Sequence, residues 1–287
     1  MSGGTLPLRG LRVVVTRPRD QADALVGELE RRGATVLVYP AIRIEDAPDP
    51  GPLRRAAARA ATYDWIVFTS ANGVEKFWGA FVESGGRVEE LAGVRFGCVG
   101  PATRRALAAR GVEAHAMPSR YVGAAVAEAV IRAHRAATAG GEGARPLEGV
   151  RVLLPLAAGA ADTLERDLRE AGAEVERVEA YRSVPDFQNA AELRRLIDGG
   201  SADVVTFTSP SAVDAFVEAV GADLGGVEVA VIGPVTEEAA LRRGLPVAIV
   251  AAEHTVEGLV HALARRWNPE RVEGAGVWEP GRRRRTE

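Results

Sequence analysis

The chain has 287 residues, of which 47% are hydrophobic and 26% are charged, proportions typical of a globular protein. Its formal net charge of −3 argues against broad nucleic-acid binding, and the lack of an apolar run of about 18 residues argues against a transmembrane helix. The single cysteine, Cys98, excludes an intrachain disulfide, and the first residues lack the pattern of a signal peptide, so we expect a cytoplasmic protein that does not associate with membranes.

The first half of the chain alternates apolar strands with amphipathic helices. We expect strands at 11–18, 35–44, 63–70, 94–100 and 112–116, and helices at 20–32, 53–61, 72–83, 102–110 and 121–137. Pro40 interrupts the second strand, and the glycine-rich residues 138–149 are expected to form a flexible loop. Such an alternation predicts a parallel sheet with helices on both faces.

The pattern then restarts in the second half. Three segments recur at one constant spacing: LRVVVTRP as VRVLLPLA, ERRGATV as REAGAEV, and FTSANGVEKF as FTSPSAVDAF. A fourth, CVGPATRRALAARGV, recurs as VIGPVTEEAALRRGLPV. The repeat predicts an α/β protein of two similar doubly wound parallel-sheet domains with a cleft between them. Such sheets bind ligands at the carboxyl ends of their strands, where the repeated turns lie.

The segment FTSANG places small polar residues where a strand ends and a helix begins. Ser70 or Asn72 stands at that boundary, and Asn72 and Glu75 have the spacing of a capping box. Ser211 and Asp214 repeat this spacing in the second copy. Helix capping is therefore one interpretation. An anion site is the other, because free N–H groups at a helix start attract a carboxylate or a phosphate.

Two further kinds of turn carry candidate binding residues. In GPAT and GPVT, Pro101 and Pro234 suit the first helical turn, and the hydroxyls of Thr103 and Thr236 could either cap the helix or contact a ligand. Arg17, in the TRP turn at a strand end, could be a surface residue or could clamp an anion.

Several catalytic motifs are missing from the sequence. It contains no HExxH, no GxxxxGK[ST], no GxSxG and no GxGxxG after a strand. The sequence therefore predicts no metal site, no nucleotide site and no covalent nucleophile. Any catalysis is expected to rest on positioning and hydrogen bonds.

The ordered set of motifs resembles the uroporphyrinogen-III synthase family. The resemblance extends from about residue 10 to about residue 265. It is carried by VVVTRP, YPAIRI, FTSANGV, VGPATRRAL, EAYRSV, FTSPSAV and IGPVTEEAAL.

The resemblance implies a domain division that differs from a simple cut between the repeats. Two connecting strands, near 40–43 and 180–183, would join the domains, and residues 268–287 would form a disordered tail. The implied domains are 1–39 plus 184–267, and 44–178.

The resemblance also implies an activity. Members of this family cyclise hydroxymethylbilane to uroporphyrinogen III, with inversion of ring D and loss of water, so the chain is expected to be a lyase of porphyrin and heme biosynthesis that needs no cofactor. A monomer is expected, with a transient contact to hydroxymethylbilane synthase as a further expectation.

The family's motifs assign roles to residues of this chain. Tyr181, in EAYRSV, matches the family's tyrosine and is the candidate catalytic residue, with packing in the connecting strand as the alternative. The candidate substrate-binding residues are Arg17, Thr69, Ser70, Asn72, Thr103, Ser209, Ser211 and Thr236.

One position departs from the family's pattern. Where the family often has an arginine, this chain has Leu156, which removes one expected carboxylate contact. A non-catalytic two-domain binding protein for a polycarboxylate or tetrapyrrole therefore stays open as an alternative. A nucleotide-dependent α/β transferase is the third hypothesis, and the missing phosphate loop argues against it.

Overall fold

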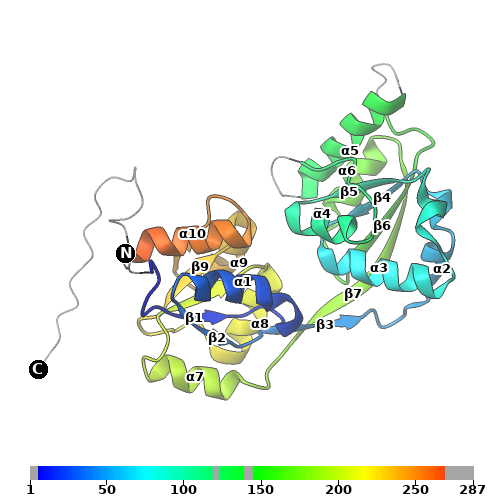
Figure 1. Cartoon of the computed structure of the whole chain (residues 1–287). Coiled ribbons are helices and arrows are strands. Elements are labelled where there is room, and N and C mark those ends of the chain that lie inside the picture. The colour runs from blue at the N-terminus through cyan, green and yellow to red at the C-terminus, as the bar shows by residue number, and fades with distance from the viewer. Residues whose placement is uncertain (1–5, 119–122, 139–144, 269–287) are drawn as a thin grey trace, which may run out of the picture. The chain divides into compact units, whose positions relative to one another are not determined.

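The computed structural model describes residues 6–118, 123–138 and 145–268 and divides into two compact units (Figure 1). Unit 1 comprises Met1–Arg43 and Pro185–Glu287, and unit 2 comprises Ile44–Val184. The chain passes between the units twice, inside strand β3 (Ile42–Asp46) and at the end of strand β7 (Glu174–Pro185).

Several expectations are not tested by this structure. The domain boundaries implied by the family and the cleft predicted from the repeat stay predictions. The expected tail lies outside the described residues except for Asn268, and so do residues 139–144 of the expected loop at 138–149.

In its described part, unit 1 is built on a five-stranded sheet with the order β10-β9-β8-β1-β2, and neighbouring strands run parallel. The strands are β1 (Arg12–Val15), β2 (Thr35–Val38), β8 (Val204–Phe207), β9 (Glu228–Val231) and β10 (Val247–Val250). The helices are α1 (Arg19–Arg31), α7 (Ala190–Asp198), α8 (Pro210–Val220), α9 (Pro234–Arg242) and α10 (Val256–Trp267). The strand order reverses between β1 and β8, so the topological switch point lies there.

The described part of unit 2 has a second five-stranded sheet, with the order β3-β7-β6-β4-β5, in which β4 to β7 are parallel. The remaining strands are β4 (Trp65–Phe68), β5 (Arg95–Cys98) and β6 (Arg151–Ala157). The helices are α2 (Gly51–Ala58), α3 (Ala71–Glu83), α4 (Pro101–Ala108), α5 (Gly123–Thr138) and α6 (Thr163–Glu170). The switch point of this sheet lies between β4 and β6.

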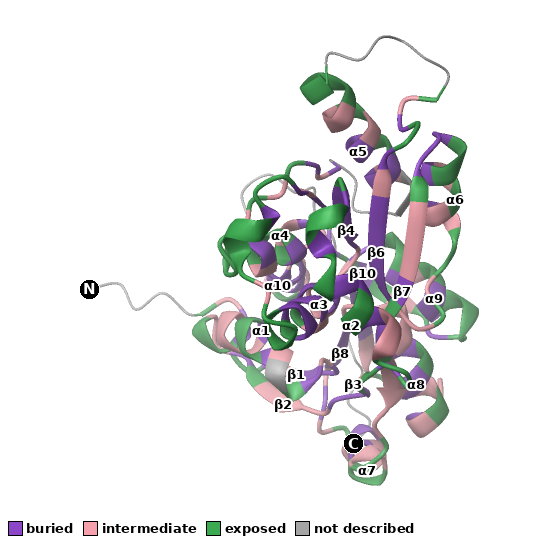
Figure 2. Ribbon diagram, turned by 90° about the vertical axis from the view of Figure 1, so that its right-hand side faces the viewer, coloured by how far each residue is buried: buried purple, intermediate pink, exposed green. Residues whose placement is uncertain are grey.

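Helices cover both faces of the unit 2 sheet. Successive side chains of a strand point to opposite faces, so neighbouring residues of β4 pack with different helices. Ile66 and Phe68 pack with side chains of α2, α3 and α4, whereas Trp65 and Val67 pack with side chains of α5 and α6. Figure 2 shows β6 buried for most of its length while the outer faces of the helices are exposed.

Unit 1 has the same layered arrangement. Val13 and Val15 pack with side chains of α1 and α10 on one face of the sheet. On strand β8, the ring of Phe207 lies 5.0 Å from the ring of Phe216 on α8. The parallel strands of both sheets, with helices on their faces, confirm the predicted α/β fold class.

One expected strand, at 112–116, is not formed. This segment makes only an isolated parallel bridge, between Gly97 and Ala116. The Phe96 N–H, which a further strand would use, donates instead to the side chain of His115 at Nδ1, at a distance of 3.1 Å. A side chain thus takes the place of a ladder hydrogen bond.

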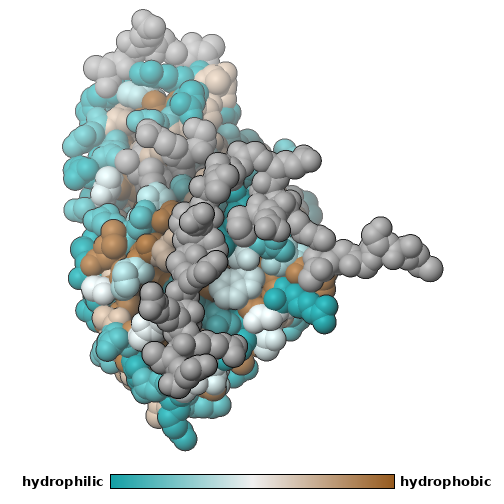
Figure 3. All heavy atoms as spheres, turned by 90° about the vertical axis from the view of Figure 1, so that its left-hand side faces the viewer, coloured by the Kyte–Doolittle hydropathy of each residue, from teal (hydrophilic) through white to brown (hydrophobic). Residues whose placement is uncertain are grey.

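Some large hydrophobic side chains are exposed at the described surface. They are Leu6, Val82, Val88, Phe187, Val235, Leu241, Val250 and Trp267. On the face drawn in Figure 3, brown residues lie among teal and white ones. Every helix within the described ranges is too short or too polar to cross a membrane.

Two histidines of unit 2 act as hydrogen-bond acceptors and must therefore be neutral. His134 accepts the indole N–H of Trp65 at Nδ1, at 3.3 Å, and His115 accepts the Phe96 N–H in the same way. Burial, the main cause, and the charge of Arg95 lower the pKa of both imidazoles. Protonation would place a hydrogen on each accepting nitrogen and break both bonds.

We expect acid to destabilise unit 2 through His115 and His134, although Glu113 and Asp64 oppose the two pKa shifts. A histidine pKa that is lower in the folded state means that the unfolded chain binds more protons. The stabilisation is therefore complete above the ordinary pKa of about 6.5 and is lost as the pH falls toward the lowered values. Melting temperatures between about pH 7.5 and about pH 5 should fall less steeply in a double variant, His115→Gln with His134→Gln. Equal slopes for the two proteins would contradict this assignment.

Candidate active site

The carboxyl edge of the unit 2 sheet gathers the predicted residues of this unit. The turn after β4 carries Thr69 and Ser70 beside the switch point, where ligands of such sheets bind. Tyr181 reaches the same edge because it pairs with Ala157, the last residue of β6. The N–H of Ala158 donates to the carbonyl of Tyr181 at 2.7 Å and fixes this register.

Tyr181 and Ser70 form a hydrogen-bonded pair. The Tyr181 hydroxyl donates to Ser70 Oγ at 2.9 Å, and the Tyr181 side chain is largely buried, with the residue 7% exposed. Ser70 is also the N-cap of α3, since its Oγ accepts the N–H of Gly73 at 3.0 Å. The structure thus joins two candidate residues that are far apart in the sequence.

The environment of Tyr181 keeps its phenol protonated. Burial raises the pKa of Tyr181, and hydrogen bonds with the side chains of Ser70 and Asn72 oppose the shift without cancelling it. The neutral phenol is a proton donor, and the two neighbouring polar groups can stabilise the phenolate that proton transfer would leave.

Gly73 explains how the first turn of α3 comes so close to β6. A Cβ at this position would lie 2.9 Å from the backbone carbonyl oxygen of Pro155 and 3.4 Å from Ser70 Oγ. Because real Cβ atoms do not approach a carbonyl so closely, only glycine allows this packing. The sequence shows this glycine but not its neighbour, so its role was missed in the sequence analysis.

The turn after β5 brings Thr103 to the same edge. Its residue is 2% exposed in the first turn of α4, and the turn is tied to β4 by the Val99 N–H, which donates to the Phe68 carbonyl at 3.1 Å.

Arg104 follows and is exposed. Burial raises the pKa of Cys98, the last residue of β5, to about 11, and the positive charge of Arg104 partly offsets this shift. The guanidinium therefore lies within electrostatic reach of the end of β5. Arg104 is a cationic candidate that the sequence analysis did not single out.

The carboxyl edge of the unit 1 sheet carries the other candidates. Arg17 follows β1 and Ser209 follows β8, so the two turns flank the switch point of this sheet. Ser209 Oγ accepts the N–H of Ala212 at 3.3 Å and lies 3.2 Å from Ser211 Oγ. Thr236 is 3% exposed in the first turn of α9.

A histidine also lies at this edge and was missed. A Cβ on Gly233 would lie 2.9 Å from Cδ2 of His254, so the imidazole packs against the backbone of the turn after β9. The sequence feature that could have identified His254 is its position between strand β10 and Thr255, the N-cap of α10.

The predicted capping boxes were wrong, whereas capping itself is confirmed. The caps are Ser70 and Ser209, each two residues earlier than Asn72 and Ser211. The backbone angles are nearly identical, with φ −156° and ψ 157° at Ser70 and φ −156° and ψ 152° at Ser209. The helices begin earlier because Ser70 and Ser209 adopt the extended conformation that an N-cap needs.

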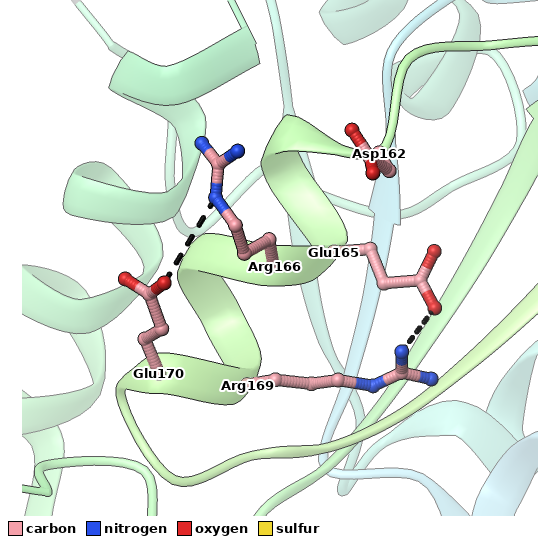
Figure 4. Close-up of a pocket in the computed structure, with 5 residues that line it drawn as sticks. All are labelled: Asp162, Glu165, Arg166, Arg169 and Glu170. Atoms are coloured by element: carbon pink, nitrogen blue, oxygen red, sulfur yellow. Dashed lines mark ion pairs between the residues drawn. The ribbon is translucent and has the colours of Figure 1, made fainter.

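A pocket of about 590 Å³ lies elsewhere, on the surface of α6 (Figure 4). Ion pairs along the helix join Arg169 to Glu165 at 2.6 Å and Arg166 to Glu170 at 3.9 Å. Asp162 adds a third carboxylate. The lining is net negative and includes none of the predicted residues, so this pocket is unsuited to a polyanionic substrate.

Within the described ranges, no group of three or more histidine, cysteine, aspartate or glutamate residues is arranged to hold a metal ion. Among the described residues, the two edges offer hydroxyls, phenols, backbone N–H groups, guanidinium groups and, in unit 1, the imidazole of His254.

The chain is similar to known proteins along most of its length. The family model described as uroporphyrinogen-III synthase HemD matches residues 23–261. A porphyrin biosynthesis protein HemD from Ruminiclostridium josui is 29% identical over 258 residues, which are 90% of this chain, and the match spans about half (49%) of that protein. A Methanothermobacter thermautotrophicus protein named for uroporphyrinogen-III synthase is 31% identical, with 88% of this chain and 97% of that protein covered. A solved mutant uroporphyrinogen III synthase from the extreme thermophile Thermus thermophilus has a TM-score of 0.60 at 23% identity, covering 91% of this chain and 100% of that chain, and supports the fold.

Proposed function

This chain belongs to the uroporphyrinogen-III synthase family, and we propose that it closes hydroxymethylbilane to uroporphyrinogen III, with inversion of ring D and loss of water. The observation that carries the proposal to individual residues is the hydrogen-bonded pair of Tyr181 and Ser70 at the switch point of unit 2. This pair supplies the proton donor that the loss of water requires.

The turns at both sheet edges would bind the carboxylates of the substrate. Free N–H groups at the starts of α3, α4, α8 and α9 favour negative charge, as helix N-termini do. The hydroxyls of Thr69, Thr103 and Thr236 lie at these turns and can donate hydrogen bonds. Arg17 and Arg104 would add a cation at each edge. A protein of net negative charge can bind a polyanion in this way, because the positive groups are local.

Tyr181 would donate the proton that lets the hydroxyl leave. Electrons from a pyrrole nitrogen move toward the hydroxymethyl carbon, the C–O bond breaks, and its electron pair stays on the oxygen. Tyr181 gives its proton to that oxygen, so water departs and a phenolate remains. The phenolate regains a proton when the new ring system loses one from a pyrrole carbon. General acid catalysis of this kind contributes about 10² to 10⁴ in rate.

The protein would also select the isomer by orientation. The electrophilic azafulvene must be attacked by the substituted position of ring D, giving a spiro intermediate that fragments and recloses. Direct closure at the unsubstituted position gives the type I isomer. Holding the reacting carbons in one geometry favours one closure over the other.

Leu156 has a structural role in this chain. It is 2% exposed and packs in the core formed with α5 and α6, on the opposite face of the sheet from Tyr181. In the sequence repeat it takes the place of Arg17. The turn after β6 therefore offers only backbone groups, and we propose that side-chain charge for the substrate comes from Arg17 and Arg104.

The finer features of the activity belong to the same proposal. We infer a lyase that acts as a monomer without a cofactor, with the domains 1–39 plus 184–267 and 44–178. The alternative, a non-catalytic protein that binds a polycarboxylate or tetrapyrrole, is not favoured by the family match.

A coupled assay tests the proposal. Hydroxymethylbilane is generated in place, the products are oxidised, and the type I and type III isomers are separated by chromatography. We expect mostly type III isomer, while the protein-free reaction gives type I. Only type I isomer, from protein shown to be folded by circular dichroism, would reject the enzyme and favour the binding protein.

We expect deletion of residues 268–287 to leave the rate of type III formation unchanged. The match to the family model ends at residue 261, and no predicted site residue lies beyond Thr236. The rate is compared between the full chain and the shortened chain at equal concentrations of folded protein. A loss of more than about tenfold would place the deleted segment in the active site.

A further inference from the structure

Ser70 Oγ is held by two donors at once. It accepts the Gly73 N–H at 3.0 Å and the Tyr181 hydroxyl at 2.9 Å. A serine hydroxyl has two acceptor lone pairs and one hydrogen, so both acceptor positions are filled and only its own hydrogen is left. In this state the Tyr181 proton points at Ser70 and is unavailable to a substrate.

Capping alone does not account for this arrangement. Ser209 caps α8 with almost the same backbone angles, but its second contact is Ser211 and not a tyrosine. The contact between Ser70 and Tyr181 therefore depends on the β6–β7 register that carries Tyr181 to the edge, together with the close approach that Gly73 permits.

We propose that Ser70 is a positioning residue that exchanges hydrogen-bond roles with Tyr181 during the reaction. The inference rests on the proposed function. Before the reaction, Ser70 accepts from the phenol and sets the position of its oxygen. When the leaving hydroxyl takes the phenol's proton, the Ser70 hydroxyl rotates and donates to the phenolate.

The exchange requires no movement of the backbone. The Gly73 N–H holds Ser70 Oγ throughout, so only two hydrogens change direction: that of the phenol, which turns to the leaving hydroxyl, and that of the serine. The positive end of α3, a helix of 13 residues, also favours negative charge on the nearby phenolate oxygen. Atoms balance, because the phenol gives one proton to the departing water and regains another that a pyrrole carbon releases when the new ring system forms.

The first test measures the ionisation of Tyr181 without substrate. All four tyrosines are replaced by 3-fluorotyrosine, whose phenol is more acidic, and titrated by fluorine NMR. A Tyr181→Phe variant identifies the Tyr181 signal. In Ser70→Ala, which has lost a hydrogen bond that lowers the Tyr181 pKa, we expect this signal to titrate at higher pH. Ser70→Thr, which keeps the hydroxyl, should titrate like the wild type.

The second test uses the rate of type III formation. Ser70→Ala should lower kcat about tenfold with KM changed less than about twofold, and Ser70→Thr should restore most of the rate. Thr255→Ala is the control for a lost cap, because Thr255 Oγ1 accepts the Gly258 N–H at 2.9 Å in the same geometry. It should lower the melting temperature about as much as Ser70→Ala and change neither the Tyr181 titration nor kcat.

The two tests distinguish a positioning role of Ser70 from a role as a substrate contact or as a helix cap alone. A loss in Ser70→Ala that falls mainly in KM would make Ser70 a substrate contact and overturn the proposal, as would an unshifted Tyr181 titration. If the wild-type protein forms no type III isomer, the proposed function fails. The role of Ser70 in catalysis fails with it, while the titration still shows whether Ser70 holds the phenol.

Discussion

Replacing Tyr181 with phenylalanine is expected to lower the rate of type III formation more than tenfold while the fold stays intact. The change removes only the hydroxyl that donates to Ser70 Oγ at 2.9 Å. Loss of one neutral hydrogen bond costs about 0.5–1.5 kcal/mol of stability, whereas loss of a general acid costs about 10² or more in rate. The effect on rate should therefore exceed the effect on the free energy of unfolding.

The measurement compares kcat and the isomer ratio in the coupled assay with the free energy of unfolding in urea. Tyr63→Phe is a matched control, because Tyr63 is also buried in unit 2 and donates to Glu176 at 2.5 Å, but lies just before β4, at the opposite end of the sheet. It should lose stability and keep its rate per folded molecule. A wild-type rate in Tyr181→Phe would remove Tyr181 from the mechanism, and equal losses in the two variants would show that the effect is structural.

Much of the fold could be predicted from the sequence, because local patterns encode it. The apolar run WIVF became the buried strand β4, and the polar residues that follow it mark the strand end. The repeat of FTSANGVEKF as FTSPSAVDAF predicted two similar caps, and the structure shows them at Ser70 and Ser209. The segment 112–116 failed because a side chain, that of His115, took the backbone donor that a strand would have used.

The candidate site was less accessible to sequence reasoning. Resemblance to a family could point to Tyr181 and Ser70 separately. Their contact depends on the register that sets Tyr181 opposite Ala157, and a shift of one residue would turn the phenol to the other face of the sheet. No local pattern fixes the pairing of segments this far apart. The same holds for Gly73, whose neighbour Pro155 belongs to another strand.

Replacing Gly73 with alanine is expected to slow type III formation about tenfold or more, although alanine favours helices. The new Cβ would lie 2.9 Å from the Pro155 carbonyl oxygen. This oxygen belongs to β6, which is held between β7 and β4, so the first turn of α3 must move instead. Overpacking of this kind costs about 1–3 kcal/mol, and the gain in helix propensity of about 1 kcal/mol offsets only part of it.

The movement would act on the rate through Ser70. The Gly73 N–H holds Ser70 Oγ at 3.0 Å, so a displaced turn carries the partner of Tyr181 with it. A misplacement of about 1 Å can cost about 10²-fold in rate. Gly79→Ala is the matched control in the same helix, because a Cβ at Gly79 meets no atom within 4 Å. It should raise the free energy of unfolding by up to about 1 kcal/mol and leave kcat unchanged. If Gly73→Ala instead resembles Gly79→Ala in both measurements, the close approach of α3 to β6 does not control the position of the phenol.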